Sequence, residues 1–191
     1  MKRQAVALLL MAPLLLSGCS TPLFLAGATA TGAAVAHDRR TTGTVVDDQA
    51  IELKAVSRLN DDADLAQAHV NVTSYNGIIL LSGEVPNRGA KARATAIVEQ
   101  IPKVRRVHNE LIIDQPSRFG SRSHDTWITT KLKSKLLASD EVEGTRVKVV
   151  TERGTVYLMG LVDHDSAEAA VLEARTTDGA KKVVKLFEYT D

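Results

Sequence analysis

Apolar residues recur along the first half of the chain at two spacings. Ile51, Ala55 and Leu59 stand four residues apart, which is the spacing of a single buried stripe on a helix. Farther on, Val70 and Val72 alternate with polar residues, as in a strand that buries one face. The pattern therefore predicts a helix followed by a half-buried strand.

A hairpin, a second helix and a third strand follow. Asn76 and Gly77 form a tight-hairpin signal, and beyond them Ile79 and Leu81 alternate as a second half-buried strand. The next helix is predicted from apolar residues at helical spacing, namely Ala90, Ala94, Ile97 and Ile101. The last strand is predicted to run through Val107, Leu111 and Ile113.

The second half of the chain repeats the first. Residues 69–85 align without a gap to residues 146–162 at an offset of 77, which pairs valines with valines and glycines with glycines. Upstream, the helical stripe of the second copy is formed by Ile128, Leu132 and Leu136. Each copy is therefore predicted to run helix, strand, strand, helix, strand.

The boundaries of the two copies follow from the start of each helix. Asp48 and Asp125 precede the two helical stripes, and we expect each to be an N-cap that accepts backbone N–H bonds. The first module is then residues 47–114 and the second is residues 124–191. Residues 115–123, which include Pro, Gly and Ser, are predicted to be a linker.

Residues 1–18 have the pattern of a secretory signal. Lys2 and Arg3 are followed by an apolar run and then by small residues. The chain's single cysteine, Cys19, comes next, and the four residues around the cleavage point match the bacterial lipobox, Leu16-Ser17-Gly18-Cys19. An ordinary signal peptide is the alternative, but the cysteine stands at the one position that a lipobox requires. We therefore expect cleavage before Cys19 and lipidation of its thiol.

Residues 19–46 are predicted to be a lipidated flexible tether. The apolar stretch at residues 23–36 is rich in Ala, Gly and Thr, and it falls short of the ~20 apolar residues that a transmembrane helix needs. Ser20 follows the cysteine, whereas an aspartate there would favour retention in the inner membrane. We expect an outer-membrane lipoprotein whose folded part faces the periplasm.

Charge and composition exclude several classes of function. Loss of Lys2 and Arg3 with the signal leaves 22 basic and 23 acidic residues, so the near-zero net charge gives no support to nucleic-acid binding. The five histidines have no metal-ligand spacing, and Asp163-His164-Asp165 is better explained as a helix N-cap than as a metal site. No catalytic motif is present. We expect no enzyme activity, no metal and no cofactor.

The repeated unit resembles the BON domain. The resemblance is carried by Val-x-Val, a turn glycine, a hydrophobic strand ending in glycine, an alanine-rich helix, and then Val104, Val107 and Asn109. The second copy departs from this pattern with Lys185 in place of Asn109. The resemblance implies an α+β fold of two tandem αββαβ modules, each a small mixed sheet packed with two helices. It also implies no catalysis, binding to phospholipid, a part in envelope integrity and association with the division site.

The first helix of the second copy is the candidate lipid-binding element. On a helical wheel its buried stripe covers about 80°, and Trp127 lies roughly 140° from the centre of that stripe. Tryptophan beside lysine is typical of a bilayer interface with anionic lipid. The candidate phospholipid-binding residues are Trp127, Lys131, Lys133, Lys135, Thr130 and Ser134.

The first copy serves as a comparison for this helix. Lys54 and Arg58 stand at the positions of two of those lysines, so a basic pair is common to both copies. The second copy has Trp127 in place of Ala50 and Lys133 in place of a valine. Two alternatives stay open: the tryptophan packs against the neighbouring module, or the same helix face binds an envelope protein, so that the chain is an adaptor.

Overall fold

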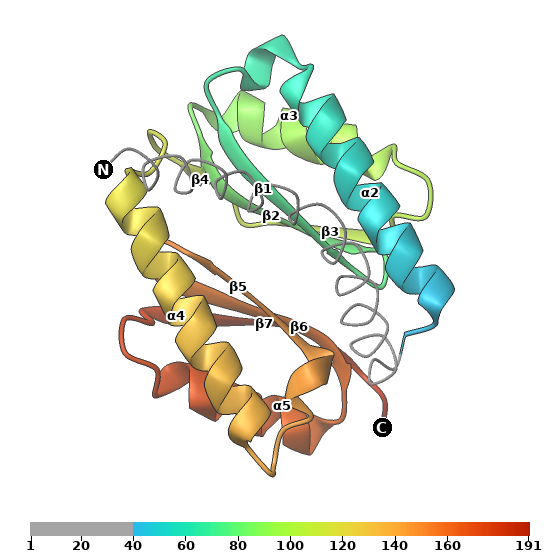
Figure 1. Ribbon diagram of the computed structural model, residues 1–191. Helices are drawn as coiled ribbons and strands as arrows, with labels where there is room; N and C mark the ends of the chain where they lie inside the picture. The colour runs from blue at the N-terminus through green and yellow to red at the C-terminus, as the bar shows by residue number, and fades with distance from the viewer. Residues whose placement is uncertain (1–39) are drawn as a thin grey trace, which may run out of the picture. The chain divides into compact units, whose positions relative to one another are not determined.

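The computed structural model describes residues 40–191. The predicted signal segment, the lipobox with Cys19 and the apolar stretch at residues 23–36 lie outside the described residues, as does most of the predicted tether. The described part contains both copies of the repeat, and Figure 1 shows its elements.

Both modules have the predicted order of helices and strands. The first consists of α2 (Thr42–Asn60), the 3-10 helix η1 (Ala63–Leu65), β1 (His69–Tyr75), β2 (Ile78–Val85), α3 (Arg88–Glu99), β3 (Arg106–Asn109) and β4 (Ile112–Ile113). The second consists of α4 (Phe119–Ala138), η2 (Gly144–Arg146), β5 (Val147–Glu152), β6 (Thr155–Val162), α5 (His164–Arg175) and β7 (Lys182–Tyr189). The last predicted strand of the first module is thus divided into β3 and β4.

Each module has a mixed sheet around a central strand. In the first module, β2 pairs antiparallel with β1 and parallel with both β3 and β4. In the second, β6 pairs antiparallel with β5 and parallel with β7. The mixed sheet that the BON resemblance implies is therefore confirmed, and so is the α+β class.

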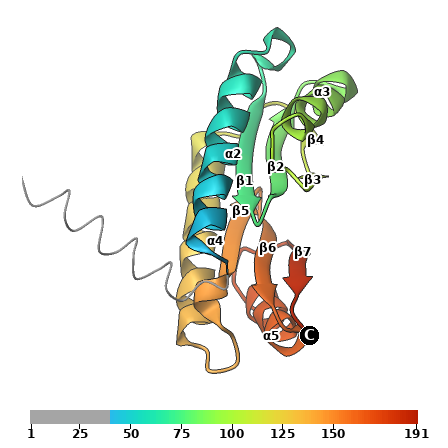
Figure 2. The same ribbon diagram turned by 90° about the vertical axis from the view of Figure 1, so that its right-hand side faces the viewer.

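Each module has one hydrophobic core, which lies between its sheet and its own two helices. In the first module α2 lies along β1, and α3 lies near β3 and β4 (Figure 2). Their apolar stripes pack on alternate strand residues such as Ile79, Leu81 and Val85, which are almost fully buried. The second module repeats this arrangement with α4 and α5 over Val156, Leu158 and others. The predicted helical stripes of both modules are confirmed.

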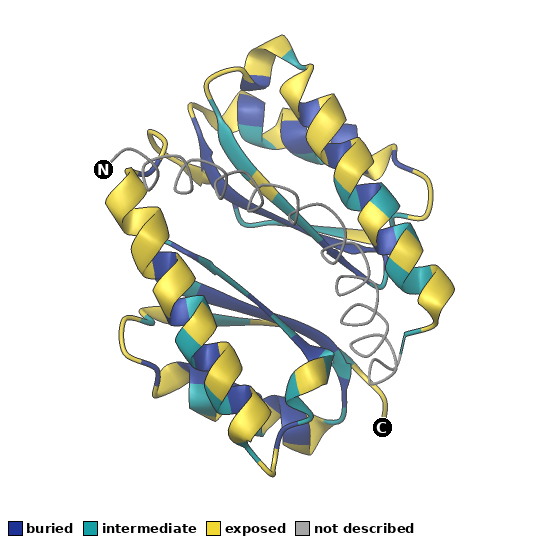
Figure 3. Cartoon of the chain, in the orientation of Figure 1, coloured by how far each residue is buried: buried dark blue, intermediate teal, exposed yellow. Residues whose placement is uncertain are grey.

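A third core joins the two modules. Ile78 and Leu80 of β2 point away from α2 and α3, and they cluster with Tyr157, Met159 and Leu186 of the second module. As a result β2 is buried at all of its positions, as the dark blue strands of Figure 3 indicate. The prediction of a half-buried strand at Ile79 and Leu81 is therefore wrong, because the opposite sheet face is covered by the other module.

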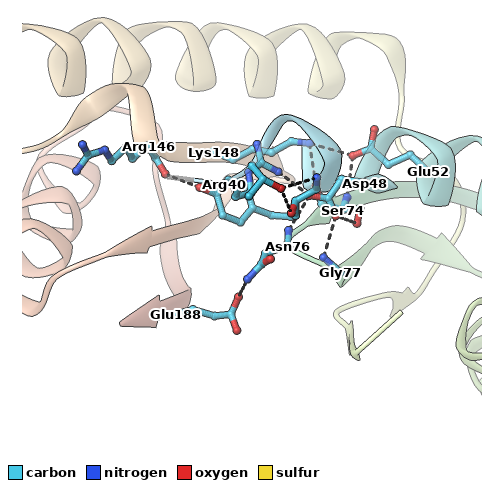
Figure 4. Close-up of polar contacts among 12 residues, drawn as sticks. Arg40, Asp48, Glu52, Ser74, Asn76, Gly77, Arg146, Lys148 and Glu188 are labelled. Atoms are coloured by element: carbon cyan, nitrogen blue, oxygen red, sulfur yellow. Dashed lines mark hydrogen bonds and ion pairs between the residues drawn. The ribbon is translucent and has the colours of Figure 1, made fainter. Parts of the chain in front are cut away.

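The expected N-cap roles of Asp48 and Asp125 are also wrong. The N-cap of α2 is Thr41, and Asp48 is a buried residue inside the helix whose carboxylate accepts from the backbone N–H groups of Asn76 and Gly77 at 2.7 and 2.8 Å (Figure 4). Asp125 has the same role inside α4. These carboxylates satisfy the hairpin turns and not the helix starts. Asn76 and Gly77 both have positive φ, 51° and 74°, and their N–H groups need an acceptor.

Both long helices begin earlier than the N-cap assignment implied. α2 begins at Thr42, inside the predicted tether, and α4 begins at Phe119, inside the predicted linker at residues 115–123. Asp163, in contrast, is the N-cap of α5, with its side chain accepting from the N–H of Ser166 at 2.8 Å. The assignment of that acidic cluster to a helix cap is confirmed.

Polar contacts surround the third core. Lys148 Nζ lies 2.9 Å from Glu52 Oε1. The hydroxyl of Tyr75 donates to the carbonyl of Arg146 at 3.3 Å. Asn76 Nδ2 donates to Glu188 Oε2 at 2.7 Å, as Figure 4 shows. These contacts are partly buried, and together with the apolar cluster they fix the register of one module on the other.

Candidate functional site

α4 has one buried side and one side in solvent. Ile128, Leu132 and Leu136 are at most 1 % exposed and face the second core. Figure 3 shows exposed residues along the rest of the helix. The periodicity of the sequence therefore predicted the buried side of this helix correctly. The opposite side, which we call the outer side, is exposed to solvent.

Trp127 lies on the outer side of α4. Its side chain is 46 % exposed, and its ring stacks on the imidazole of His124 with 5.6 Å between ring centroids. Lys131 Nζ lies 4.9 Å from the centroid of the indole, a cation–π geometry. Both contacts come from within α4, so the indole is held on the helix surface with almost half of its area in solvent.

Two further apolar side chains share this side of the helix. Phe119 is 82 % exposed and Leu137 is 63 % exposed. On a helical wheel both lie about 80° from Trp127, on the solvent side of the helix. The periodicity of the sequence marks neither residue as part of the site. Phe119 was assigned to a linker, and Leu137 directly follows a residue of the buried stripe.

Two of the three candidate lysines are ion-paired on the side toward α5. Lys131 Nζ lies 2.5 Å from Asp178 Oδ2, and Lys135 Nζ lies 3.3 Å from Glu173 Oε2. The hydrogen bond and the positive charge of Lys131 lower the pKa of Asp178, so this carboxyl stays ionised to lower pH than usual. The sequence could not show these partners, because both acids come from a segment more than 35 residues away.

The remaining candidate residues differ in what they offer. Lys133 is exposed and borders two clefts at the junction of the modules. Thr130 and Ser134 are exposed on the outer side between the apolar residues. Their hydroxyls donate to carbonyls one turn earlier in α4, at 2.9 and 3.0 Å. The free lone pairs of the hydroxyls can still accept hydrogen bonds from a ligand or from water.

A cleft of about 650 Å³ lies between α4 and the first module. It is lined by Thr126, Thr129 and Lys133 of α4, by His69 and Asn71 of β1, and by Glu152 at the end of β5. Two of these residues, His69 and Glu152, form a group with Glu84 that the sequence did not reveal. No local spacing could have revealed that group, because its members come from three strands.

None of the helices within residues 40–191 has both the length and the apolar character needed to cross a bilayer.

Comparison with known proteins agrees with the repeat. The BON-domain family profile matches residues 47–115 and 124–191. The chain is 42 % identical to the outer membrane lipoprotein DolP of Haemophilus influenzae over 97 % of its own length and 96 % of the relative's. It is 40 % identical to a 21 kDa hemolysin of Actinobacillus pleuropneumoniae, over 80 % of this chain and 79 % of that protein.

Among solved structures, the C-terminal domain of CdsD, a structural protein of the type III secretion system of Chlamydia trachomatis, is similar over 73 % of this chain and 96 % of that one. The TM-score is 0.32 at 13 % identity, which is too distant to bear on function. The family is shown by the two profile matches and by the relative that is similar over nearly the full length of both chains. The chain belongs to the BON-domain family, as a two-domain outer-membrane lipoprotein similar to DolP.

Proposed function

We propose that the second BON domain binds anionic phospholipid through the outer side of α4, and that the lipid anchor at Cys19 holds the protein on the outer membrane with its domains in the periplasm. The observation that carries the proposal is the exposure of Phe119, Trp127 and Leu137 along one side of a single helix. Large apolar side chains on the outer side of a surface helix are typical of helices that lie in the headgroup region.

The charges around these residues favour an anionic surface. Lys133 is exposed, and Arg118 and Arg122 at the start of α4 are exposed as well. Each basic residue near an anionic leaflet contributes ~1 kcal/mol. Lys131 and Lys135 contribute less, because their carboxylate partners cancel much of their charge. The binding is therefore weak for the isolated domain.

Weak binding is sufficient for a tethered protein. A lipid anchor makes contact between α4 and the surrounding leaflet intramolecular, at a high effective concentration. The domain can then respond to local patches of anionic lipid. Such a response provides a physical basis for the part in envelope integrity, and for the association with the division site, that the BON resemblance implies.

The test is vesicle co-flotation of the purified mature chain, residues 19–191, with the lipid anchor removed by a Cys19→Ser change. Vesicles with anionic headgroups are compared with zwitterionic ones. We expect binding to the anionic vesicles only, and a blue shift in the fluorescence of the sole tryptophan. Trp127→Ala should weaken binding roughly tenfold, since burial of a large apolar side chain is worth on the order of 1.5 kcal/mol or more. Lys133→Glu should weaken it by a similar factor.

The first module supplies matched controls. Leu53 is 74 % exposed on α2, so Leu53→Ala removes an exposed apolar side chain from the equivalent helix. Lys54→Glu reverses a charge at the position equivalent to Lys131. Both variants should bind vesicles as the wild type does. If Trp127→Ala and Lys133→Glu also bind as the wild type does, α4 is not the lipid site. If the wild type ignores anionic vesicles, the same face serves a protein partner and the chain is an adaptor.

A further inference from the structure

Three metal-ligating side chains converge where the two modules meet. His69 and Glu84 are directly opposite one another on β1 and β2, and Glu152 is the last residue of β5 in the other module. One ligand atom of each lies within 4.8 Å of the others. The closest pair is His69 Nδ1 and Glu84 Oε2, at 2.8 Å. The group is therefore assembled only when the modules pack together.

Both carboxylates are buried, which is costly without compensation. Glu84 is 0 % exposed and Glu152 is 7 % exposed. The guanidinium of Arg153 lies 3.5 Å from Glu84, but it lies closer to Asp114, at 3.0 Å. Glu152 accepts one hydrogen bond, from Asn71 at 2.8 Å. The partners of the two buried carboxylates are thus a neutral amide, a histidine, and a guanidinium that also pairs with Asp114. These partners leave negative charge that a further cation can offset.

The repeat shows that the fold does not require these residues. The offset that aligns the two modules places Arg146, Leu161 and Tyr75 at the positions of His69, Glu84 and Glu152. There the hydroxyl of Tyr75 donates to the carbonyl of Arg146, and Leu161 packs on the apolar third core. The two modules therefore pack together at this end of their interface without a buried carboxylate at the equivalent positions. Only the end that contains His69, Glu84 and Glu152 has buried acids at these positions.

We propose that His69, Glu84 and Glu152 bind a divalent transition-metal ion of the zinc type, which joins the two BON domains. One imidazole nitrogen and two carboxylates suit Zn²⁺, whereas Mg²⁺ and Ca²⁺ favour sites built from oxygen alone. His69 and Glu152 line the cleft beside α4, which gives the ion a route from solvent. The three ligands belong to β1, β2 and β5 and not to α4, so the proposal does not rest on lipid binding.

The ligand geometry fits with small movements. A tetrahedral zinc ion at ~2.0–2.1 Å from each ligand atom separates those atoms by a little over 3 Å. The histidine and Glu84 must therefore move apart by a few tenths of an ångström from 2.8 Å, and Glu152 must close in from the wider separation.

The test is calorimetric titration of the metal-stripped full chain in detergent with Zn²⁺, and with Mg²⁺ as a comparison. We expect one saturable Zn²⁺ site, no comparable heat from Mg²⁺, and a higher melting temperature with Zn²⁺ because binding favours the folded state. His69→Gln and Glu152→Gln should each weaken Zn²⁺ binding by at least about tenfold, given that even the loss of an outer-shell partner costs 10–100-fold.

His164 provides the matched control. Its Nδ1 also lies 2.8 Å from a carboxylate, that of Asp191, but the pair is exposed and has no second acid in the group. His164→Gln should bind Zn²⁺ as the wild type does. Circular dichroism checks that each variant is folded, and the absorption bands of Co²⁺ report mixed nitrogen and oxygen ligation. The proposal is overturned if the wild type has no saturable site, or if folded His69→Gln and Glu152→Gln bind Zn²⁺ unchanged.

Discussion

Asp48 and Asp125 show how one buried carboxylate can fix a hairpin on a helix. Asp48 accepts from the hydroxyl of Ser74 at 2.6 Å as well as from two turn N–H groups, and Arg40 Nη1 lies 2.6 Å from Asp48 Oδ2. Asp125 accepts from the N–H groups of Arg153 and Gly154, both at 2.8 Å. The two carboxylates thus make the same backbone contacts, with more side-chain partners in the first module.

Asp125→Asn and Asp48→Asn should both destabilise the protein. An amide has a single acceptor oxygen, so its NH₂ group would face a backbone N–H, and the loss of a buried partner costs ~1–3 kcal/mol. Asp48→Asn should cost more, because it also removes the charge opposite Arg40. Urea unfolding measures both. Asp140→Asn, at an exposed position after α4, should stay within ~0.5 kcal/mol of wild type. Equal stability of all three variants would contradict this assignment.

These aspartates also show what the pattern of the sequence cannot predict. Their position before the apolar stripe of each helix is typical of an N-cap, and the Asn76-Gly77 turn was correctly predicted. Nothing local shows that the turn packs against the helix at the level of Asp48, because that contact joins residues 28 positions apart. Periodicity predicts which face of an element is buried. It does not predict which polar group at the edge of that face meets a distant turn.

At the scale of the element, the outer side of α4 carries a tryptophan and two other exposed apolar side chains. The wheel placed Trp127 in solvent, where it lies, and it placed Lys131 beside the tryptophan. The wheel could not predict that Lys131 and Lys135 are paired with acids near the end of α5. Phe119 was missed because a helix expected to begin at Asp125 cannot include it. The helix carries more apolar surface and less free positive charge than its sequence indicated.

Asp178→Asn should strengthen binding to anionic vesicles. The hydrogen bond from Lys131 and its positive charge lower the pKa of Asp178, so this carboxyl stays ionised to lower pH than usual and offsets the charge of Lys131. Its removal frees a positive charge beside Trp127, which is worth ~1 kcal/mol at an anionic surface, or about fivefold in affinity. Vesicle co-flotation at low and at high salt measures the gain, which should shrink as salt screens it.

Glu168→Gln is the control for that gain. Glu168 is also exposed and pairs with a lysine, Lys185, at 2.8 Å, but the pair joins α5 to β7 and not α5 to α4. The two variants change the net charge equally. If Glu168→Gln raises vesicle binding as much as Asp178→Asn does, the effect comes from net charge alone and the ion pair on α4 has no special role.

For the whole molecule, the packing of the modules decides the burial of the strands. Ile78 and Leu80 belong to a core that contains Tyr157, Met159 and Leu186 of the other copy. The sequence predicted two modules and their internal order correctly. It did not predict that the two sheets would share a core, because only Ile79 and Leu81 were assigned to a buried face, whereas Ile78 and Leu80 on the opposite face are equally apolar and pack on the other copy. The same packing buries Glu84 and Glu152 between the modules.

Glu152 should make the stability of the metal-free protein fall as pH rises. Burial raises the pKa of this carboxyl in the folded state above its ordinary value of 4.5, so the folded protein holds the proton more tightly than the unfolded chain does. The stabilisation is complete below the unfolded pKa and is lost as pH rises through the folded pKa. Glu152→Gln cannot ionise, and its amide oxygen can still accept from Asn71. The variant should therefore gain stability over the wild type as pH rises from about 4.5.

Urea unfolding at a series of pH values, with a chelator present, measures this difference. Comparison of variant with wild type at each pH removes the contributions of the other acids. Glu168→Gln should show the opposite trend, because Lys185 lowers the pKa of Glu168, and the stabilisation from that carboxylate is present above its unfolded pKa and lost in acid. A constant difference between Glu152→Gln and wild type across the series would mean that Glu152 is solvated in the folded protein. In that case the two modules do not enclose it, and the shared core does not extend to this end of the interface.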